Sequence, residues 1–140
     1  MHPVTLYQVL VRQSTERPDA EALVTTSARL TYRELRRRTE LTARALIAAG
    51  VQRGDHVGIM MGNDEHWVEL FFGAATIGAV TIPINTRFKA AELAFCLKQA
   101  DVKLLALVDR FLGIDFASFL REAEPAVDDR LPGSHAPLLQ

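Results

Sequence analysis

The chain has 140 residues, of which 49% are hydrophobic and 24% are charged, and its formal net charge is −1. This length and composition predict one ordinary hydrophobic core. The near-neutral charge leaves no surplus positive field for gripping nucleic acid or an anionic membrane, so we expect no nucleic-acid partner. Cys96 is the only cysteine, which excludes a disulfide framework and a cysteine-based zinc site and favours the reducing cytoplasm.

The sequence shows neither a secretory signal nor a transmembrane segment. Residues 1–13 lack a basic start followed by an apolar stretch and a small-residue cleavage site. The apolar run 70–84 is shorter than the roughly 18 to 20 residues that cross a bilayer, and Gly78 and Pro83 interrupt it. We therefore expect no membrane span and a cytoplasmic location.

Helical and extended patterns alternate along the chain. Apolar spacing predicts helices over 6–16, 32–49, 65–77, 90–99 and 116–122, and strands over 21–25, 56–61, 80–82 and 104–108. Strands that lack clean polar alternation and that are each followed by a helix are typical of a parallel sheet. The expected fold class is α/β, with three layers, a mostly parallel sheet and helices on both faces.

Two of the predicted helices carry distinct patterns. The helix at 32–49 places apolar and small residues on one face and charged residues on the other. The helix at 65–77 is apolar almost all round, so we expect it to be nearly surrounded, with Gly73 allowing close approach. A helix of this kind is unusual in a small independent domain, and it suggests that neighbouring structure lies outside these residues.

The start of the helix at 32 has the strongest local signal in the chain. Thr31 stands at the N-cap position, and Glu34 can reach back to the backbone N–H of Thr31. Leu30 and Leu35 can pack together outside and inside the first turn. This combination predicts a capping box with a hydrophobic staple.

Further motifs follow this start in a fixed order. The hexapeptide L-T-Y-R-E-L at 30–35 is followed by G-V-Q-R-G-D at 50–55 and by G-A-V-T-I-P-I-N-T-R at 78–87. This ordered set resembles the N-terminal region of adenylate-forming enzymes, which include acyl-CoA synthetases, peptide-synthetase adenylation domains and luciferases. The resemblance covers about residues 4–122. It implies that 1–124 form an incomplete N-terminal α/β piece of that fold, followed by an irregular tail at 125–140.

The resemblance also implies a chemistry for a longer protein. Family members join a carboxylate to ATP, giving an acyl adenylate and pyrophosphate, and CoA-dependent members then transfer the acyl group to CoA. ATP, magnesium and CoA are the implied cofactors of a full-length enzyme. The family's phosphate loop, T-S-G-T-T-G-x-P-K, does not occur in these 140 residues. We therefore expect no catalytic residue, no metal ligand and no cofactor of its own for this chain, with the remainder of the ligase fold as its partner.

Residues 83–87 and 108–116 look more like acyl-CoA synthetases, acting on long-chain fatty acids or related carboxylates, than like peptide-synthetase domains. The latter commonly carry an aspartate where this chain has Asn85. Two alternatives stay open at this point. The chain could be a stand-alone, non-catalytic interaction domain, or the N-terminal part of a peptide-synthetase adenylation domain.

Arg87 is the one candidate site residue. It follows the predicted strand at 80–82, in a loop outside the carboxyl end of a strand, where open α/β sheets commonly bind ligands. In CoA-dependent relatives the arginine of this turn can hold a phosphate of CoA, and the resemblance transfers that role to Arg87. The competing interpretation is an arginine that fastens its own loop. Arg110, after the strand at 104–108, has weaker motif support.

Other catalytic patterns are weak. The glycine spacing at 73–78 lacks the Lys and Ser/Thr of a phosphate loop. His56 and His66 fall on different elements, so structural roles are expected for both. No G-x-S-x-G marks a hydrolase. Three consecutive arginines at 36–38 fan through roughly 200° of a helix, which predicts a solvated surface.

Overall fold

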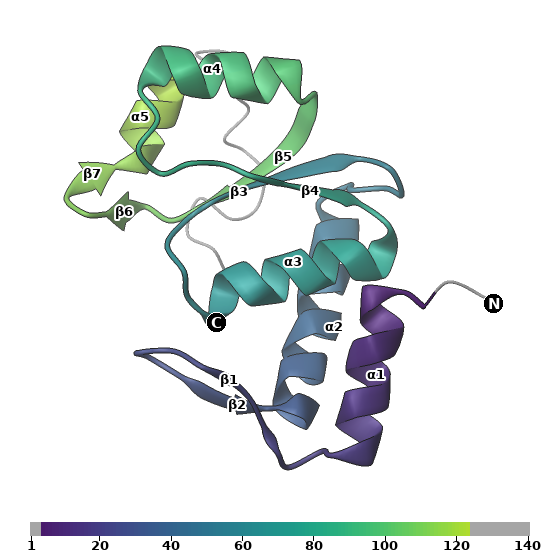
Figure 1. The fold of residues 1–140 in the computed structure, drawn as a ribbon. Helices are drawn as coiled ribbons and strands as arrows, with labels where there is room; N and C mark the ends of the chain where they lie inside the picture. Colours follow the sequence, from purple (N-terminus) through teal and green to yellow (C-terminus); the bar gives the residue numbers. More distant parts are fainter. Residues whose placement is uncertain (1–3, 124–140) are drawn as a thin grey trace.

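The computed structural model describes residues 4–123, which form helices packed on both sides of a small sheet (Figure 1). In chain order the elements are α1 (Leu6–Glu16), β1 (Glu21–Val24), β2 (Arg29–Thr31), α2 (Tyr32–Ala48), β3 (His56–Met60), α3 (Glu65–Ile77), β4 (Val80–Pro83), α4 (Ala90–Gln99), β5 (Val102–Leu107), β6 (Arg110–Phe111), β7 (Ile114–Asp115) and α5 (Phe116–Ala123).

The central sheet has three parallel strands in the order β4-β3-β5. In the middle strand, Ile59 pairs with Pro83 on one side and with Ala106 on the other. The loop after β4 continues the ladder, since the Ile84 N–H donates to the Ile59 carbonyl at 2.9 Å. The prediction of a parallel sheet built from these three segments is confirmed.

Side chains of β3 alternate between two buried faces of the sheet. Val57 and Ile59 pack with Leu46 of α2 and Leu70 of α3 in one cluster. Met60 points to the opposite face, where the buried cluster also contains Ile84, Leu93 and Phe116, from the loop after β4, α4 and α5. Helices therefore cover both faces, as the sequence predicted for a three-layer α/β fold (Figure 1).

Helix α3 lies between two cores and has no exposed residue. Its sheet-facing side contributes Leu70 and Ala74 to the cluster under β3, while Val68 and Phe72 pack against a further cluster formed by α1, β2 and α2. A Cβ added at Gly73 would stand 2.9 Å from the Cγ2 of Thr42, so α2 and α3 approach closely there. The predicted enclosure of this helix is confirmed.

The start of α2 has the predicted capping geometry. The Glu34 N–H donates to the Thr31 hydroxyl at 3.3 Å, and the Thr31 N–H donates to the Glu34 carboxylate at 2.8 Å. Leu30 and Leu35 are both buried in the cluster with Leu10 of α1. These contacts fix the entry of the chain into α2 and join it to α1.

The strand predicted over 21–25 corresponds to β1, but the two short antiparallel hairpins that contain β1 and β2, and β6 and β7, were not predicted. Strand β2 pairs with β1, and β6 pairs with β7. The missed strands β2, β6 and β7 have only two or three residues, too few for a period-two pattern, and Thr31 both ends β2 and caps α2. The boundary at residue 124 and the irregular tail predicted for 125–140 lie outside the described residues. Within residues 4–123 no helix combines the length and apolar character that crossing a bilayer requires.

Candidate functional site

The carboxyl ends of β3, β4 and β5 meet at one edge of the sheet, because the three strands are parallel. Ligands of open α/β sheets commonly bind outside this edge. The loop after β4, which carries Arg87, and the segment after β5, which carries Arg110, both leave from it. We therefore take this edge as the candidate site.

The loop after β4 is a turn held at both ends. Ile84 is buried, and Phe88 packs against the same cluster beneath α4. Between them the Asn85 side-chain oxygen accepts the Arg87 N–H at 2.9 Å, and the Asn85 carbonyl accepts the Phe88 N–H at 3.2 Å. An Asn side chain that bonds the backbone two residues on is a standard way to fix a turn. The backbone of Arg87 is thus held in place by Asn85.

The Arg87 side chain is exposed. Among residues 4–123 no carboxylate or carbonyl pairs with its guanidinium, and its one hydrogen bond in that part of the chain is made by its backbone. In the described structure, it is therefore the side chain of Asn85, and not that of Arg87, that fixes the loop. The guanidinium of Arg87 points into solvent from a fixed backbone.

The chain after β5 folds over the neighbouring loop. Phe111 of β6 lies against Gly62, just after β3, where an added Cβ would stand 2.5 Å from the ring. The ring of Phe111 stacks on that of buried Phe116 at a centroid distance of 6.4 Å. Arg110 is exposed on the same short strand. The loops after β3 and β5 are therefore packed together beside the Arg87 turn.

A buried carboxylate joins the first hairpin to the start of α3. Glu65 is 7% exposed and accepts hydrogen bonds from the hydroxyls of Thr25, at 2.7 Å, and Ser27, at 2.9 Å. Burial, the largest single influence, raises the pKa of Glu65. The Thr25 hydroxyl, the backbone N–H of Glu65, the Ser27 hydroxyl and the charge of His66 together outweigh burial and hold that pKa below its ordinary value. The charged carboxylate therefore fastens the turn between β1 and β2 to α3.

A second buried carboxylate, Glu69, lies one turn further along α3. Its side chain is 5% exposed and pairs with the guanidinium of Arg38 at 3.1 Å, while His66 lies 3.4 Å away. Arg36 forms a separate pair with Glu40 at 2.8 Å. The prediction that the arginine run at 36–38 is simply a solvated surface is wrong for Arg38, because α3 brings a buried carboxylate against it.

The remaining candidates from the sequence have structural positions. His56, at the start of β3, contacts the carbonyl of Ala100 through its Nδ1, whereas His66 lies in α3 beside Glu69. Gly73 is buried inside α3 and Gly78 ends that helix, so they form no phosphate loop. Within residues 4–123 no group of three His, Cys, Asp or Glu side chains is placed to hold a metal ion.

Comparison with known proteins identifies the family. Residues 10–134 match the family model described as AMP-binding enzyme. The chain belongs to the AMP-binding enzyme family. Among curated relatives, this AMP-binding chain is 40% identical over 132 residues to the acyl-CoA ligase SID4 of Ajellomyces capsulatus, covering 92% of this chain and 22% of the relative. It spans about a fifth of the length of the curated relatives it matches.

Solved structures of AMP-binding enzymes share the fold. A putative long-chain-fatty-acid CoA ligase from Rhodopseudomonas palustris has a TM-score of 0.80 and 31% identity, covering 91% of this chain and 31% of that one. The N-terminal domain of FACL13 from Mycobacterium tuberculosis has a TM-score of 0.73 and 34% identity, covering 75% of this chain and 27% of that one. The predicted resemblance to the N-terminal region of adenylate-forming enzymes, most like acyl-CoA synthetases, is confirmed.

Sequence reasoning proposed Arg87 as a site residue, which stays a prediction, and it did not anticipate the buried carboxylates Glu65 and Glu69. The two glutamates are four residues apart on a helix that is otherwise almost wholly apolar, and that spacing places both on one face. Charged residues on a helix expected to be surrounded must find partners. The spacing of the two glutamates on an apolar helix could have predicted buried carboxylates, but it does not indicate which donors contact them.

Proposed function

We propose that this chain is the N-terminal part of a carboxylate–CoA ligase. The complete enzyme would activate a carboxylic acid with ATP to an acyl adenylate, release pyrophosphate and transfer the acyl group to CoA. The observation that carries the proposal is the fixed Asn85–Arg87 turn at the carboxyl edge of the sheet, in a chain whose curated relatives include acyl-CoA ligases. The cytoplasm is the proposed location, since the single cysteine suits a reducing compartment.

The described residues fit only part of that chemistry. Stabilising the charge that develops between phosphate and carboxylate needs several donors aimed at the reacting groups. At the candidate edge, Arg87 and Arg110 are exposed cations, and no described trio of acidic or histidine side chains stands ready for magnesium. We therefore propose that the ATP chemistry depends on residues of the longer ligase, and that the 140-residue chain does not catalyse adenylation alone.

Within the complete enzyme we assign Arg87 the role of binding a phosphate of CoA. A planar guanidinium matches phosphate oxygens with two parallel hydrogen bonds. The Asn85 contact fixes the backbone of Arg87, so less ordering is required when a phosphate binds. CoA supplies its chemistry through its thiol, which displaces AMP; Arg87 contributes binding and orientation.

The two half-reactions of a ligase carrying this sequence test the role of Arg87. In Arg87→Ala we expect thioester formation to lose a charge-assisted contact of about 1.5 to 3 kcal/mol, seen as a roughly 10- to 150-fold drop in kcat/KM for CoA. Carboxylate-dependent pyrophosphate exchange should stay near the wild-type rate. Arg87→Lys should recover part of the loss, because lysine keeps the charge without the planar fork.

Arg44→Ala is the matched control, since it removes an exposed arginine from α2, far along the chain from the candidate edge. It should leave both half-reactions unchanged. An unchanged KM for CoA in Arg87→Ala would end the assignment. Equal loss in both half-reactions, together with a lowered Tm, would show that Arg87 only supports its loop.

The two alternative functions predict different results in the same assays. A peptide-synthetase adenylation domain would perform pyrophosphate exchange in the longer protein but would not form a free acyl-CoA. A stand-alone interaction domain would carry neither step in any natural context. Formation of acyl-CoA by a protein with this N-terminus supports the ligase over both.

A further inference from the structure

The turn after β4 carries positive charge and no acidic residue. Residues 80–91 contain Arg87 and Lys89 but no Asp or Glu. Both cations are exposed on either side of Phe88, which packs against the cluster beneath α4, and in the described part of the chain neither forms a salt bridge. The next carboxylate along the chain, that of Glu92, accepts the Lys89 N–H at 2.7 Å at the start of α4. The turn therefore presents cationic surface at the candidate edge.

The acceptor that fixes this turn is uncharged. The Asn85 side-chain oxygen accepts the Arg87 N–H at 2.9 Å. An aspartate can accept the same bond, because Asn and Asp side chains both form turns of this kind. A carboxylate would also stand beside the guanidinium of Arg87 as a competing anion and weaken its attraction for an anionic ligand. The turn itself does not require asparagine, but a turn that keeps its positive charge does.

The other half of the Asn85 amide is open to a ligand. Its oxygen is held by the Arg87 N–H, and among residues 4–123 its nitrogen makes no hydrogen bond. The side chain of Asn85 is exposed. A side-chain amide nitrogen carries two N–H donors, and such donors suit phosphate oxygens as the guanidinium does. Asn85 therefore offers donors to the same ligand that Arg87 attracts.

We propose that Asn85 is a specificity-determining residue, which makes the enzyme prefer a thiol acceptor that carries phosphate. This assignment rests on the proposed carboxylate–CoA ligase function. Arg87 and Lys89 attract the phosphate, and the amide nitrogen of Asn85 donates to it. The oxygen of the same amide holds the turn without neutralising the guanidinium. A thiol that lacks phosphate gains nothing from these three side chains.

The preference for CoA over pantetheine, in a ligase carrying this N-terminus, measures the effect. Pantetheine has the thiol arm of CoA without phosphate, so the ratio of the two kcat/KM values isolates the phosphate contribution. In Asn85→Asp we expect this ratio to fall roughly tenfold, because the added charge repels phosphate from the turn. The fall should shrink as the ionic strength rises, since salt screens exposed charges. Asn85→Ser should lose less, because its hydroxyl is neutral and can still accept the backbone N–H, though more weakly.

A double-mutant cycle tests whether the added charge acts at the Arg87 site. In an Arg87→Ala background, Asn85→Asp should lower the ratio clearly less than it does in the wild type, because the guanidinium that it opposes is gone. Residues in direct contact show such coupling, whereas distant and independent sites have additive effects.

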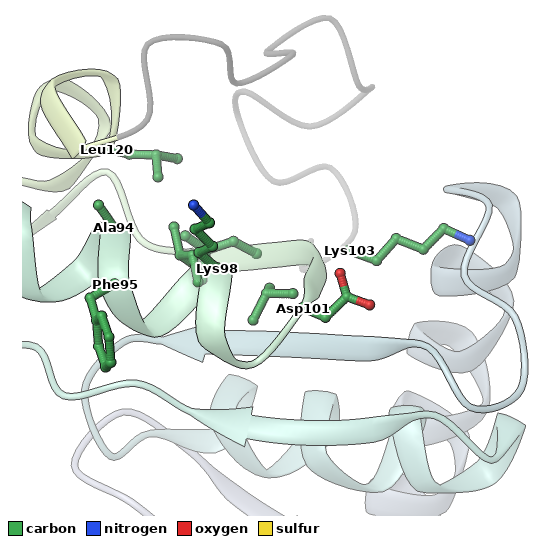
Figure 2. A pocket seen from close by; sticks show the side chains of 9 residues that line it. Ala94, Phe95, Lys98, Asp101, Lys103 and Leu120 are labelled. Carbon is green, nitrogen blue, oxygen red and sulfur yellow. The ribbon is translucent and has the colours of Figure 1, made fainter.

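Two exposed residues away from the turn provide matched controls. Gln52→Glu makes the same amide-to-carboxylate change before β3, at the opposite edge of the sheet. Lys98→Ala removes a lysine near the other end of α4, where Lys98 lines an open groove beside β5 (Figure 2). The ratio should stay at the wild-type value in both controls, whereas Lys89→Ala at the start of α4 should lower it several-fold.

Three results would overturn the proposal while leaving the ligase function standing. A wild-type ratio in Asn85→Asp would show that the neutrality of Asn85 plays no part. Equal falls in Asn85→Asp and Asn85→Ser, independent of ionic strength, would show that Asn85 only shapes its turn. An undiminished fall in the Arg87→Ala background would show that Asn85 does not act at the Arg87 site. Failure of the proposed function is distinct, because the wild-type protein would then form no acyl-CoA at all, and both proposals would be refuted.

Discussion

The two faces of the central sheet are covered to different degrees within residues 4–123. On the α2 and α3 face, α3 lies between two cores, and Glu65 and Glu69 connect it to the first hairpin and to α2. On the α4 and α5 face, the core around Met60 is bordered by an open groove with Phe95 exposed. Both faces bury apolar side chains, but the first also has two buried carboxylates that connect its elements.

This difference separates two tasks of the domain. The first face packs α2 and α3 against the sheet whose carboxyl edge carries the Arg87 turn. On the second face Phe95 is exposed, and β5 pairs only with β3 within residues 4–123. The chain spans about a fifth of the length of its curated relatives. Substitutions on each face in turn test this comparison of the two faces.

The largest effect should come from opening a cavity on each face. Leu46 and Leu93 are both fully buried, the first beneath α2 and the second beneath α4. We expect Leu46→Ala to lower the free energy of unfolding by about 4 kcal/mol and Leu93→Ala by about 2 kcal/mol, because the cost of a cavity depends on how well its surroundings can collapse. Urea unfolding measures both losses of unfolding free energy, provided that the variants and the wild type have equal m-values. Equal losses would show that the two faces are packed alike.

A smaller effect should follow from removing a partner of a buried charge. Arg38→Ala leaves the carboxylate of Glu69 with only His66 beside it, so we expect a loss of about 2 kcal/mol at neutral pH. Arg37→Ala, which removes an exposed neighbour on the same helix, should change stability by less than about 0.5 kcal/mol. Thermal unfolding compares the two variants. Equal Tm values in Arg38→Ala and Arg37→Ala would show that the contact between Arg38 and Glu69 contributes nothing to stability.

The smallest effect concerns Glu65 and depends on pH. Because its folded pKa lies below the ordinary value, its contribution is present above the unfolded pKa of about 4.3 and is lost as the pH falls through the folded pKa. Glu65→Gln should therefore be less stable than the wild type by about 1 kcal/mol at pH 7, and the difference should shrink toward pH 3. Denaturant titrations at both pH values measure it, with Glu16→Gln on the surface of α1 as control. A difference that grows on acidification would contradict the assigned direction.

Sequence reasoning located the long elements because their signals are local. The bounds of α1, α3 and α4 were predicted to the residue, since apolar periodicity marks all three and a side-chain cap also marks the starts of α1 and α3. The short strands β2, β6 and β7 depend on pairing between segments and were missed. Arg87 was proposed through a motif, and its role stays a prediction. The contact between Arg38 and Glu69 joins α2 to α3, so it depends on tertiary packing, which no local pattern specifies.

The central claim is that this chain supplies a scaffold and a CoA-facing turn, while the ATP chemistry requires the rest of a ligase. Carboxylate-dependent exchange of labelled pyrophosphate into ATP tests it most directly, measured on the purified 140-residue protein and on a longer ligase that carries the same N-terminus. The account predicts exchange by the longer protein and none above background by the 140-residue chain with any carboxylate. Exchange catalysed by the 140-residue chain alone would contradict it.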